Sequence, residues 1–406
     1  MRKSGIVIAI AAVLVTACGS SEPAEEAAAD LLFLRANNGV AVIEPGAAEA
    51  EFSSRDAVPA ADWSTAVQAR IARRSTALMT VDTRSGAPVW SSEAPGRLAV
   101  KTVSSDGDML ALAPTRQLHY SYGRNVTELV IVRKGSAEPQ TISLAGNYEP
   151  EAFSTDGTSL FVLKYTPARL PTQYQVRRLD LATESVHDVF SVDAELQESM
   201  RGTARVQAMS PDGRFLYTLY SAGFGPERHA FIHVLNLEEK WAHCIDLPHE
   251  FAKVPQRETT LAVAPDGDRL YVANSEAAML AEIDTGELSV TRTAPVTFDP
   301  IGSGKSYSAV GAGSVFFARG SRVVAVDREG LGQLASWDVA DKITGLQVGA
   351  EGEHLYVAAA RLITTFDAAT GKQLESFDPP ELGGIKQLGP VTRPQTFAPK
   401  TVSCAC

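Results

Sequence analysis

The sequence has little that could cross a lipid bilayer. Its N-terminal apolar run from Ile6 to Val15 follows Arg2 and Lys3, but a spanning helix needs about 20 apolar residues. A basic start, a short apolar stretch and small residues are typical of an export signal. We therefore expect residues 1–17 to be a signal peptide and the mature chain to act outside the cytoplasm.

Positive charge is also scarce. The formal net charge is -11, and it becomes -13 when Arg2 and Lys3 leave with the signal peptide. So acidic a surface repels phosphate backbones and anionic lipid head groups. We predict no nucleic-acid partner, and membrane attachment would have to come from a covalent lipid rather than from a basic patch.

Cysteine is rare, and one of the four cysteines has a distinctive setting. Val15-Thr16-Ala17-Cys18 resembles the lipobox of bacterial lipoproteins. The resemblance implies cleavage before Cys18 and a diacylglyceryl group on its thiol, which would anchor the chain to the cell membrane as a lipoprotein. Residues 18–30 are acidic and poor in large apolar side chains, so we expect a disordered tether there.

Three further cysteines remain, Cys244, Cys404 and Cys406. In an oxidising exterior an odd number is compatible with one disulfide, in which Cys244 pairs with one of the terminal residues. A fully reduced set and a metal site are the alternatives.

Helical runs are absent, and a repeated turn takes their place. Acidic-Gly pairs begin at Asp106, Asp156, Asp212, Asp266 and Glu351, and each is followed by a short run rich in apolar residues that predicts a strand. Glycine accepts the positive φ that a tight hairpin requires, and β-branched and aromatic residues favour strands. A degenerate copy with Ala312 in place of the acidic residue fills the longest gap. Counting all copies, strands are expected to begin near residues 31, 63, 108, 158, 213, 268, 314 and 353.

A second phrase follows each copy, an apolar strand that ends at an aspartate before a glycine-containing turn, as at Asp82, Asp284, Asp327 and Asp367. Each unit therefore has about four short strands, which cannot bury both faces alone. We predict an all-β fold, a β-propeller of seven or eight four-stranded blades over residues 31–391, with residues 392–406 as a C-terminal tail. The segment 383–391 would close the ring by pairing with the first blade. A linked pair of β-sandwiches is the alternative fold.

The phrases at Pro265–Val272 and Asp367–Lys372 resemble the YVTN-type and quinoprotein-type repeats of WD-like propellers. This resemblance covers nearly the whole mature chain. It implies the architecture, together with a choice between binding modules and enzymes such as lactonases and quinone-dependent dehydrogenases. The cofactor-binding residues of the quinoproteins do not map onto this chain, so no cofactor is assigned.

Three features of the sequence bear on possible chemistry. Gly302 to Ser306 imitates part of a phosphate-binding loop, but its first glycine is missing and Tyr307 to Val310 predicts a strand rather than the required helix. A cluster of histidines and Cys244 lies within one unit without a standard metal-ligand spacing; its histidines are His229, His233, His243 and His249. No Gly-x-Ser-x-Gly elbow is present. We assign no catalytic, cofactor-binding or metal residue, and Cys18 is the one site residue, for lipidation.

Long insertions on neighbouring units are the remaining pointer to function, because loops on a rigid scaffold often carry it. They span residues 120–127, 165–174 and 221–229, and their aromatic and basic side chains would suit a protein or peptide contact; these are Tyr120, Tyr122, Arg124, Tyr165, Arg169, Tyr174, Phe224 and Arg228. We expect a binding or scaffold module for a protein, peptide or small ligand, with a propeller enzyme as the alternative.

Overall fold

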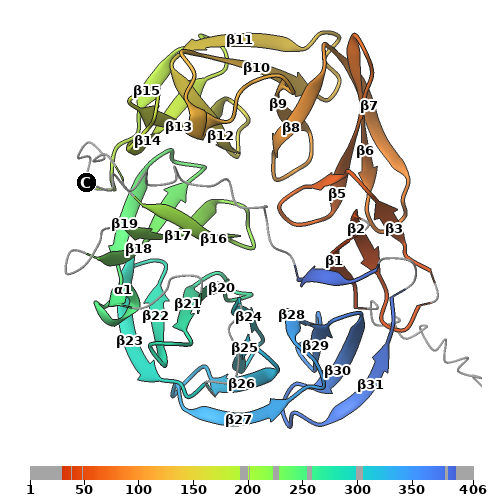
Figure 1. Cartoon of the computed structure of the whole chain (residues 1–406), viewed down its shortest axis with the longest axis vertical. Coiled ribbons are helices and arrows are strands. Elements are labelled where there is room, and N and C mark those ends of the chain that lie inside the picture. The colour runs from red at the N-terminus through yellow and green to blue at the C-terminus, as the bar shows by residue number, and fades with distance from the viewer. Residues whose placement is uncertain are drawn as a thin grey trace, which may run out of the picture.

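The computed structural model shows eight four-stranded antiparallel sheets arranged in a ring around a central channel (Figure 1). It describes residues 30–37, 39–47, 49–192, 200, 202–222, 228–253, 258–298, 305–379 and 383–389. The predicted β-propeller is therefore confirmed, with eight blades rather than seven and without the alternative sandwich pair. No helix among the described residues is both long and apolar enough to span a membrane.

The blades are named here in chain order, with the strand nearest the channel first. Blade 1 is β32 (Ile385–Leu388), β1 (Leu32–Ala36), β2 (Gly39–Ile43) and β3 (Phe52–Ser54). Blade 2 is β4 (Val58–Pro59), β5 (Thr65–Ile71), β6 (Ser75–Asp82) and β7 (Pro88–Pro95). Blade 3 is β8 (Leu98–Val103), β9 (Met109–Pro114), β10 (Val126–Arg133) and β11 (Gln140–Ala145), with the 3-10 helix η1 (Tyr120–Tyr122) before β10. Blade 4 is β12 (Asn147–Phe153), β13 (Ser159–Thr166), β14 (Gln173–Asp180) and β15 (Val186–Asp188).

The second half of the ring follows the same order. Blade 5 is β16 (Thr203–Met209), β17 (Phe215–Ala222), β18 (His229–Asn236) and β19 (Ala242–Asp246), followed by the short helix α1 (Glu250–Lys253). Blade 6 is β20 (Thr259–Val263), β21 (Arg269–Asn274), β22 (Met279–Asp284) and β23 (Ser289–Pro295). Blade 7 is β24 (Tyr307–Val310), β25 (Ser314–Arg319), β26 (Arg322–Asp327) and β27 (Gln333–Asp338). Blade 8 is β28 (Ile343–Val348), β29 (His354–Ala359), β30 (Leu362–Asp367) and β31 (Gln373–Phe377).

The closing strand β32 pairs with β1, as the sequence predicted for segment 383–391. Leu388 lies opposite Leu34, and Gln387 lies opposite Arg35. The closing strand also packs tightly on blade 8, because a Cβ atom on Gly345 would lie 2.2 Å from the Leu388 backbone nitrogen. The first and last parts of the chain thus share one sheet, which removes an exposed sheet edge.

The repeated acidic-Gly turns have the local structure that their composition indicates. In blade 3 the Asp106 carboxylate accepts hydrogen bonds from the Ser104 hydroxyl and, at 3.0 Å, from the Asp108 backbone N–H. Gly107 then adopts a φ of 73°. Gly313, which follows Ala312 in the degenerate copy, is not among the glycines with positive φ. The positive φ of the glycine is thus found in the turn that has the acidic residue and not in the copy that lacks it.

Antiparallel pairing gives the ring two different ends. The first and third connections of each blade lie at one end, which we call the turn face because the acidic-Gly turns lie there. The second connection and the crossover to the next blade lie at the other end, which we call the loop face.

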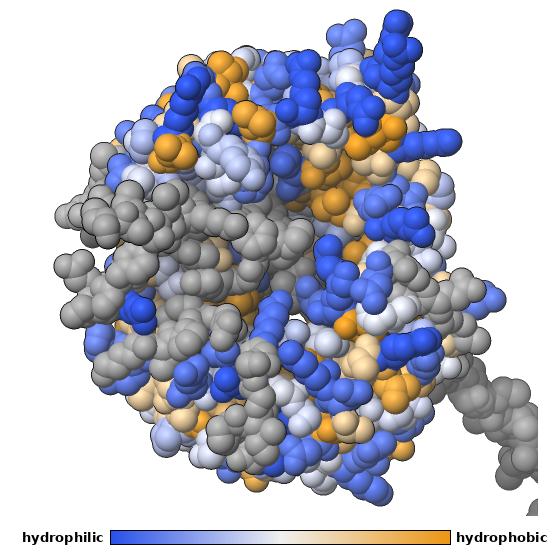
Figure 2. All heavy atoms as spheres, in the orientation of Figure 1, coloured by the Kyte–Doolittle hydropathy of each residue, from blue (hydrophilic) through white to orange (hydrophobic). Residues whose placement is uncertain are grey.

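Polar and charged side chains are spread over the surface shown in Figure 2, with apolar side chains in smaller groups between them.

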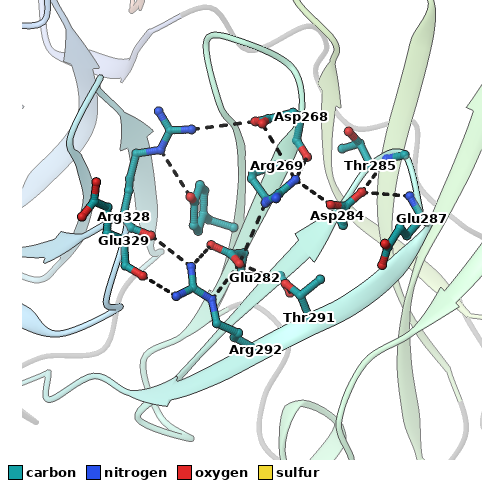
Figure 3. A network of polar contacts seen from close by, with 12 residues as sticks. Asp268, Arg269, Glu282, Asp284, Thr285, Glu287, Thr291, Arg292, Arg328 and Glu329 are labelled. Atoms are coloured by element: carbon teal, nitrogen blue, oxygen red, sulfur yellow. Dashed lines mark hydrogen bonds and ion pairs between the residues drawn. The ribbon is translucent and has the colours of Figure 1, made fainter.

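Ion pairs on the outer part of the ring join neighbouring blades (Figure 3). The buried Glu282 carboxylate of blade 6 receives two hydrogen bonds from Arg292, at 2.9 Å from Nε and 2.7 Å from Nη2. Arg292 also donates to the backbone carbonyls of Arg328 and Glu329 in blade 7. Burial raises the pKa of the Glu282 carboxyl, but the hydrogen bonds from Arg292 and Thr291 outweigh it and hold that pKa below its usual value.

Candidate binding channel

The central channel contains a cavity of about 880 Å³. Its walls come mainly from the strands β16, β20, β24, β28 and β32. Apolar side chains such as Leu261 and Val263 alternate around it with hydroxyl and amide groups such as Ser308 and Gln347. Cavities of several hundred cubic ångströms with this mixture are typical of small-molecule sites.

A second cavity of about 240 Å³ adjoins the first on the side of blades 1 to 5. Ala61, Ser105, Gln207 and Met209 line both cavities, so the two spaces are neighbours in one channel. The second space is open because β4, the channel strand of blade 2, has two residues and ends at Pro59. Proline lacks the N–H that a longer ladder would need.

β-bulges shape the wall of this second cavity. In β8 the register shifts so that Lys101 is an extra residue between Val100 and Thr102, and in β12 Glu151 is an extra residue between Pro150 and Ala152. Bulges of this kind re-aim side chains and are common beside functional sites. Both bulged residues line the smaller cavity.

Two buried glutamates of β12, Glu149 and Glu151, dominate the electrostatics there. The Glu149 carboxylate forms ion pairs with Lys101 at 3.2 Å and with Arg124 at 2.6 Å. The Glu151 carboxylate accepts a hydrogen bond from the side-chain amide of Gln207, which also donates to the Thr218 hydroxyl at 3.1 Å. Both carboxylates are thus held in fixed positions by neighbouring side chains.

These polar side chains were not predicted as site residues, although the repeat carries a signal for them. The fifth residue before the turn aspartate is Lys101 in blade 3, Glu151 in blade 4 and Gln207 in blade 5. The same position holds leucine in blades 6 and 8, at Leu261 and Leu346. Polar residues at one repeat position in three consecutive blades therefore mark the polar side of the channel.

The insertion loops differ from their predicted role as contact surfaces. Tyr120, Tyr165 and Tyr174 are buried, and the rings of Tyr120 and Tyr165 stack with centroids 4.4 Å apart. Burial, together with the charges of Glu149 and Glu151, raises the pKa of the Tyr165 hydroxyl well above its usual value. These aromatic side chains form core between blades 3, 4 and 5, and their assignment to a contact surface is wrong.

Other side chains on these loops or just beside them do face solvent. Tyr122 is 74% exposed, Leu170 67% and Leu118 62%, the three highest values among the large apolar side chains of the described residues. The buried Arg124 holds the backbone beside these side chains in place. Its guanidinium donates a hydrogen bond to the Leu118 carbonyl at 2.9 Å and another to Glu149. Its backbone N–H also bonds the Ala168 carbonyl of the neighbouring loop.

The remaining sequence candidates are found in separate places. Tyr307 to Val310 is strand β24, as predicted, so the segment that ends at Ser306 does not lead into a helix. His233 is buried on β18 opposite the exposed Cys244 on β19. No group of three or more His, Cys, Asp or Glu side chains within the described ranges is placed to hold a metal ion. Cys18, Phe224, Cys404 and Cys406 lie outside the described residues.

No known protein family matches the sequence, and no curated protein is significantly similar to it. Among solved structures, BamB from Moraxella catarrhalis is 15% identical, covers 79% of this chain and 87% of its own, and has a TM-score of 0.45. Sqt1 from Saccharomyces cerevisiae is 11% identical over 79% of this chain and 84% of its own, with a TM-score of 0.48. Hydrazine synthase from Kuenenia stuttgartiensis is 12% identical over 86% and 93%, with a TM-score of 0.41. At these values the fold assignment rests on the eight sheets themselves.

Proposed function

We propose that this chain is a lipid-anchored, extracytoplasmic binding protein that holds a small ligand in its central channel. The observation that supports the proposal most is the cavity of about 880 Å³ with its mixed apolar, hydroxyl and amide wall. A binding site needs apolar area for affinity and a few fixed polar groups for orientation. The proposal also includes a relationship to the YVTN-type propellers, which the repeats resemble.

The arrangement of the channel favours binding over catalysis. A general acid or base needs a carboxyl that can exchange a proton with a substrate. Glu149 is instead engaged by two cations, and Glu151 receives the Gln207 amide. A propeller enzyme of the lactonase or quinone-linked type is the alternative, and the same two glutamates are the residues on which it would depend.

Ligand capture tests the channel directly. We would release the purified protein from the membrane with mild detergent and identify copurifying small molecules by native mass spectrometry. Val263→Trp at a half-buried position of the cavity wall should reduce ligand occupancy because the larger indole takes up cavity space, whereas Leu334→Trp on the exposed face of β27 should not. Equal occupancy in the two variants would contradict the proposal.

The anchor is a separate element of the proposal. Asp30, the first described residue, is fixed to blade 8, because its carboxylate accepts hydrogen bonds from the Ala350 N–H at 2.7 Å and the Tyr356 hydroxyl at 2.6 Å. The propeller therefore begins at a defined point, and residues 18–29 would be left to connect it to lipid on Cys18. We expect Cys18→Ser to lose labelling by fatty acid and to leave the membrane fraction. Membrane retention of this variant with no change in mass would contradict the anchor.

Protein docking is a second binding role, and the exposed side chains of Leu118, Tyr122 and Leu170 favour it. Arg116 and Arg169 are also exposed on these loops. Residues 109–127 contain no acidic side chain although the whole chain is acidic. The fitting partner is thus a protein surface that presents apolar and acidic groups. Crosslinking from Tyr122→p-benzoylphenylalanine in membranes should trap one discrete partner, and the same label at Leu374 on β31 should not.

A further inference from the structure

Blade 2 has an inner edge that is open over half of its length. Its channel strand β4 has two residues, whereas the channel strands of the other seven blades have four to seven. β4 pairs only with Ala66 and Val67 of β5. Residues 68–71, the second half of β5, pair with β6 on one side and with no described strand on the other. This open edge lies toward the loop face, because β5 runs from the turn face to the loop face.

The hydrogen-bond pattern shows which backbone groups the open edge presents. In an antiparallel pair, successive residues of a strand direct their N–H and C=O groups alternately toward one neighbour and the other. The bond from the Ala72 N–H to the Ser75 carbonyl, at 2.8 Å, fixes this alternation. Ala69 and Ile71 therefore direct their N–H and C=O groups away from β6. Neither has a backbone hydrogen-bond partner on that side among the described residues.

The exposure of β5 agrees with an open edge. The second strands of blades 6 and 8, β21 and β29, are buried over four or more consecutive residues. In β5 only Ala66 and Val67, the two residues opposite β4, are buried, and exposure increases toward Ile71, which is 41% exposed. Unpaired backbone groups at a solvent-exposed edge are a template for a further strand.

Blade 1 has a similar gap, and there an amide group fills it. β32 does not reach the start of β1. The side-chain amide of Gln347 accepts a hydrogen bond from the Phe33 N–H at 3.0 Å and donates one to the Leu31 carbonyl. No described side chain does the same for Ala69 and Ile71. Since a side-chain amide has the donor and acceptor of a peptide group, the edge of blade 2 is suited to a peptide backbone.

The hairpin at the end of the open edge is basic. Residues 63–81 contain Arg70, Arg73 and Arg74 and no acidic side chain, although the whole chain has a net charge of -11. The three arginines are exposed, and none forms an ion pair with a described residue. A segment that pairs with this edge would therefore gain from carboxylates that reach the guanidinium groups.

We infer that the inner edge of blade 2 binds an extended acidic peptide of a partner protein. The peptide adds a strand beside residues 68–71, with main-chain hydrogen bonds to Ala69 and Ile71. Its carboxylates pair with the arginines of the hairpin, and an apolar side chain covers Ile71. This inference goes beyond the proposed function, because the edge needs no ligand in the cavity of the channel.

A set of labelled peptides tests the inference. The probe is a fluorescein-labelled peptide of alternating valine and glutamate, and its affinity for the purified protein is measured by fluorescence anisotropy. A second peptide has lysine in place of glutamate. Two more carry backbone N-methyl groups, one on the valines and one on the glutamates, so that each blocks one edge of the peptide strand.

Protein variants complete the test. Ala69→Pro removes an N–H that points away from β6 and leaves the bonds to β6 in place. Arg70→Gln/Arg73→Gln/Arg74→Gln removes the positive charge. Arg361→Gln is the matched control, because this exposed arginine lies on the corresponding hairpin of blade 8, where β28 completes the inner edge. Circular dichroism checks the fold of each variant.

We expect the glutamate peptide to bind the wild type, and the lysine peptide to bind about tenfold more weakly or less. At least one N-methylated peptide should lose about tenfold in affinity, as should Ala69→Pro and the triple arginine variant toward the unmodified peptide. Arg361→Gln and the cavity variant Val263→Trp should bind as the wild type does. Hydrogen exchange should slow at residues 68–71 when the peptide is bound.

The inference is overturned if the wild type does not bind the glutamate peptide, or if both N-methylated peptides bind as tightly as the unmodified one. Unchanged affinity in a folded Ala69→Pro, or protection from exchange only elsewhere in the chain, also overturns it. If Ala69→Pro does not fold, the N-methylated peptides and the exchange at residues 68–71 decide with the wild type. Weaker peptide binding by Val263→Trp would place the peptide in the channel cavity and refute the edge.

Discussion

The Lys240 ammonium of blade 5 lies 2.7 Å from the Asp156 carboxylate of blade 4. Lys240 is in the third turn of its blade, and Asp156 is in the first turn of the preceding one. Arg328 of blade 7 makes the same connection to Asp266 of blade 6 at 2.9 Å. The turn aspartates therefore have two roles, since they shape their own hairpins and also join adjacent blades on the turn face.

Removing this link should cost a modest amount of stability. Burial raises the pKa of the Asp156 carboxyl, but hydrogen bonds from Lys240, Ser154 and Thr158 outweigh it and hold the pKa well below its usual value. We expect Lys240→Met to lower the free energy of unfolding by roughly 0.5–1 kcal/mol, because the pair is partly exposed. The difference should be present at neutral pH and shrink as the pH falls below about 4, where the carboxyl becomes protonated in the unfolded chain and then in the folded one. Urea unfolding at several pH values measures it, with Lys372→Met as the exposed control.

The Glu282 and Arg292 pair should be more sensitive, because Glu282 is buried. Arg292→Ala leaves a buried carboxylate without its two strongest donors, and we expect a loss of about 2–4 kcal/mol. Adding Glu282→Gln should restore part of that loss, since the neutral amide costs less to bury. Urea unfolding of the single and double variants decides the point. A double variant that is less stable than Arg292→Ala alone would refute this account.

Substitution of Gly345, which packs against the closing strand β32, should strongly lower stability. Gly345→Ala would place a methyl group against the Leu388 backbone at 2.2 Å, so β28 and β32 would have to separate. We expect destabilisation by about 1–3 kcal/mol or more, measured as a lower midpoint of thermal unfolding. Gly313→Ala is the matched control, because no atom lies within 4 Å of its added Cβ and its φ is not positive. Equal midpoints for the two variants would show that ring closure does not depend on this contact.

His233 should make the propeller sensitive to mild acid. Desolvation, and then the neighbouring His243, lower its pKa to about 4. The unfolded chain therefore binds a proton near pH 6.5 that the folded chain refuses until about pH 4. Stability should consequently fall as the pH drops through that interval, by up to about 3 kcal/mol for this one group. His233→Gln should flatten the dependence of the unfolding free energy on pH, whereas His187→Gln on the exposed strand β15 should leave its slope unchanged.

The repeat was predictable from the sequence because its signals are local. The Ser104, Asp106 and Gly107 turn is held by hydrogen bonds that span a few residues, so the pattern of residue types predicts the structure. The carboxylate of Asp367, in the second recurring phrase, likewise accepts the Thr370 backbone N–H at 2.7 Å, as expected of a turn former. These local patterns were enough to predict the positions of the strands, the closing segment and the role of the aspartates as turn formers.

The sequence by itself determined an all-β ring of repeated four-stranded units, because turns and strand alternation depend on near neighbours along the chain. The tertiary structure alone decided that the blades number eight, that Tyr120 and Tyr165 are core while Tyr122 is exposed, and that Glu151 and Gln207 meet in the channel. Burial and partnership are properties of residues that meet across blades. Glu151 and Gln207 are 56 positions apart in the chain, so no local pattern could place them together, and only the packing of blade 4 against blade 5 does.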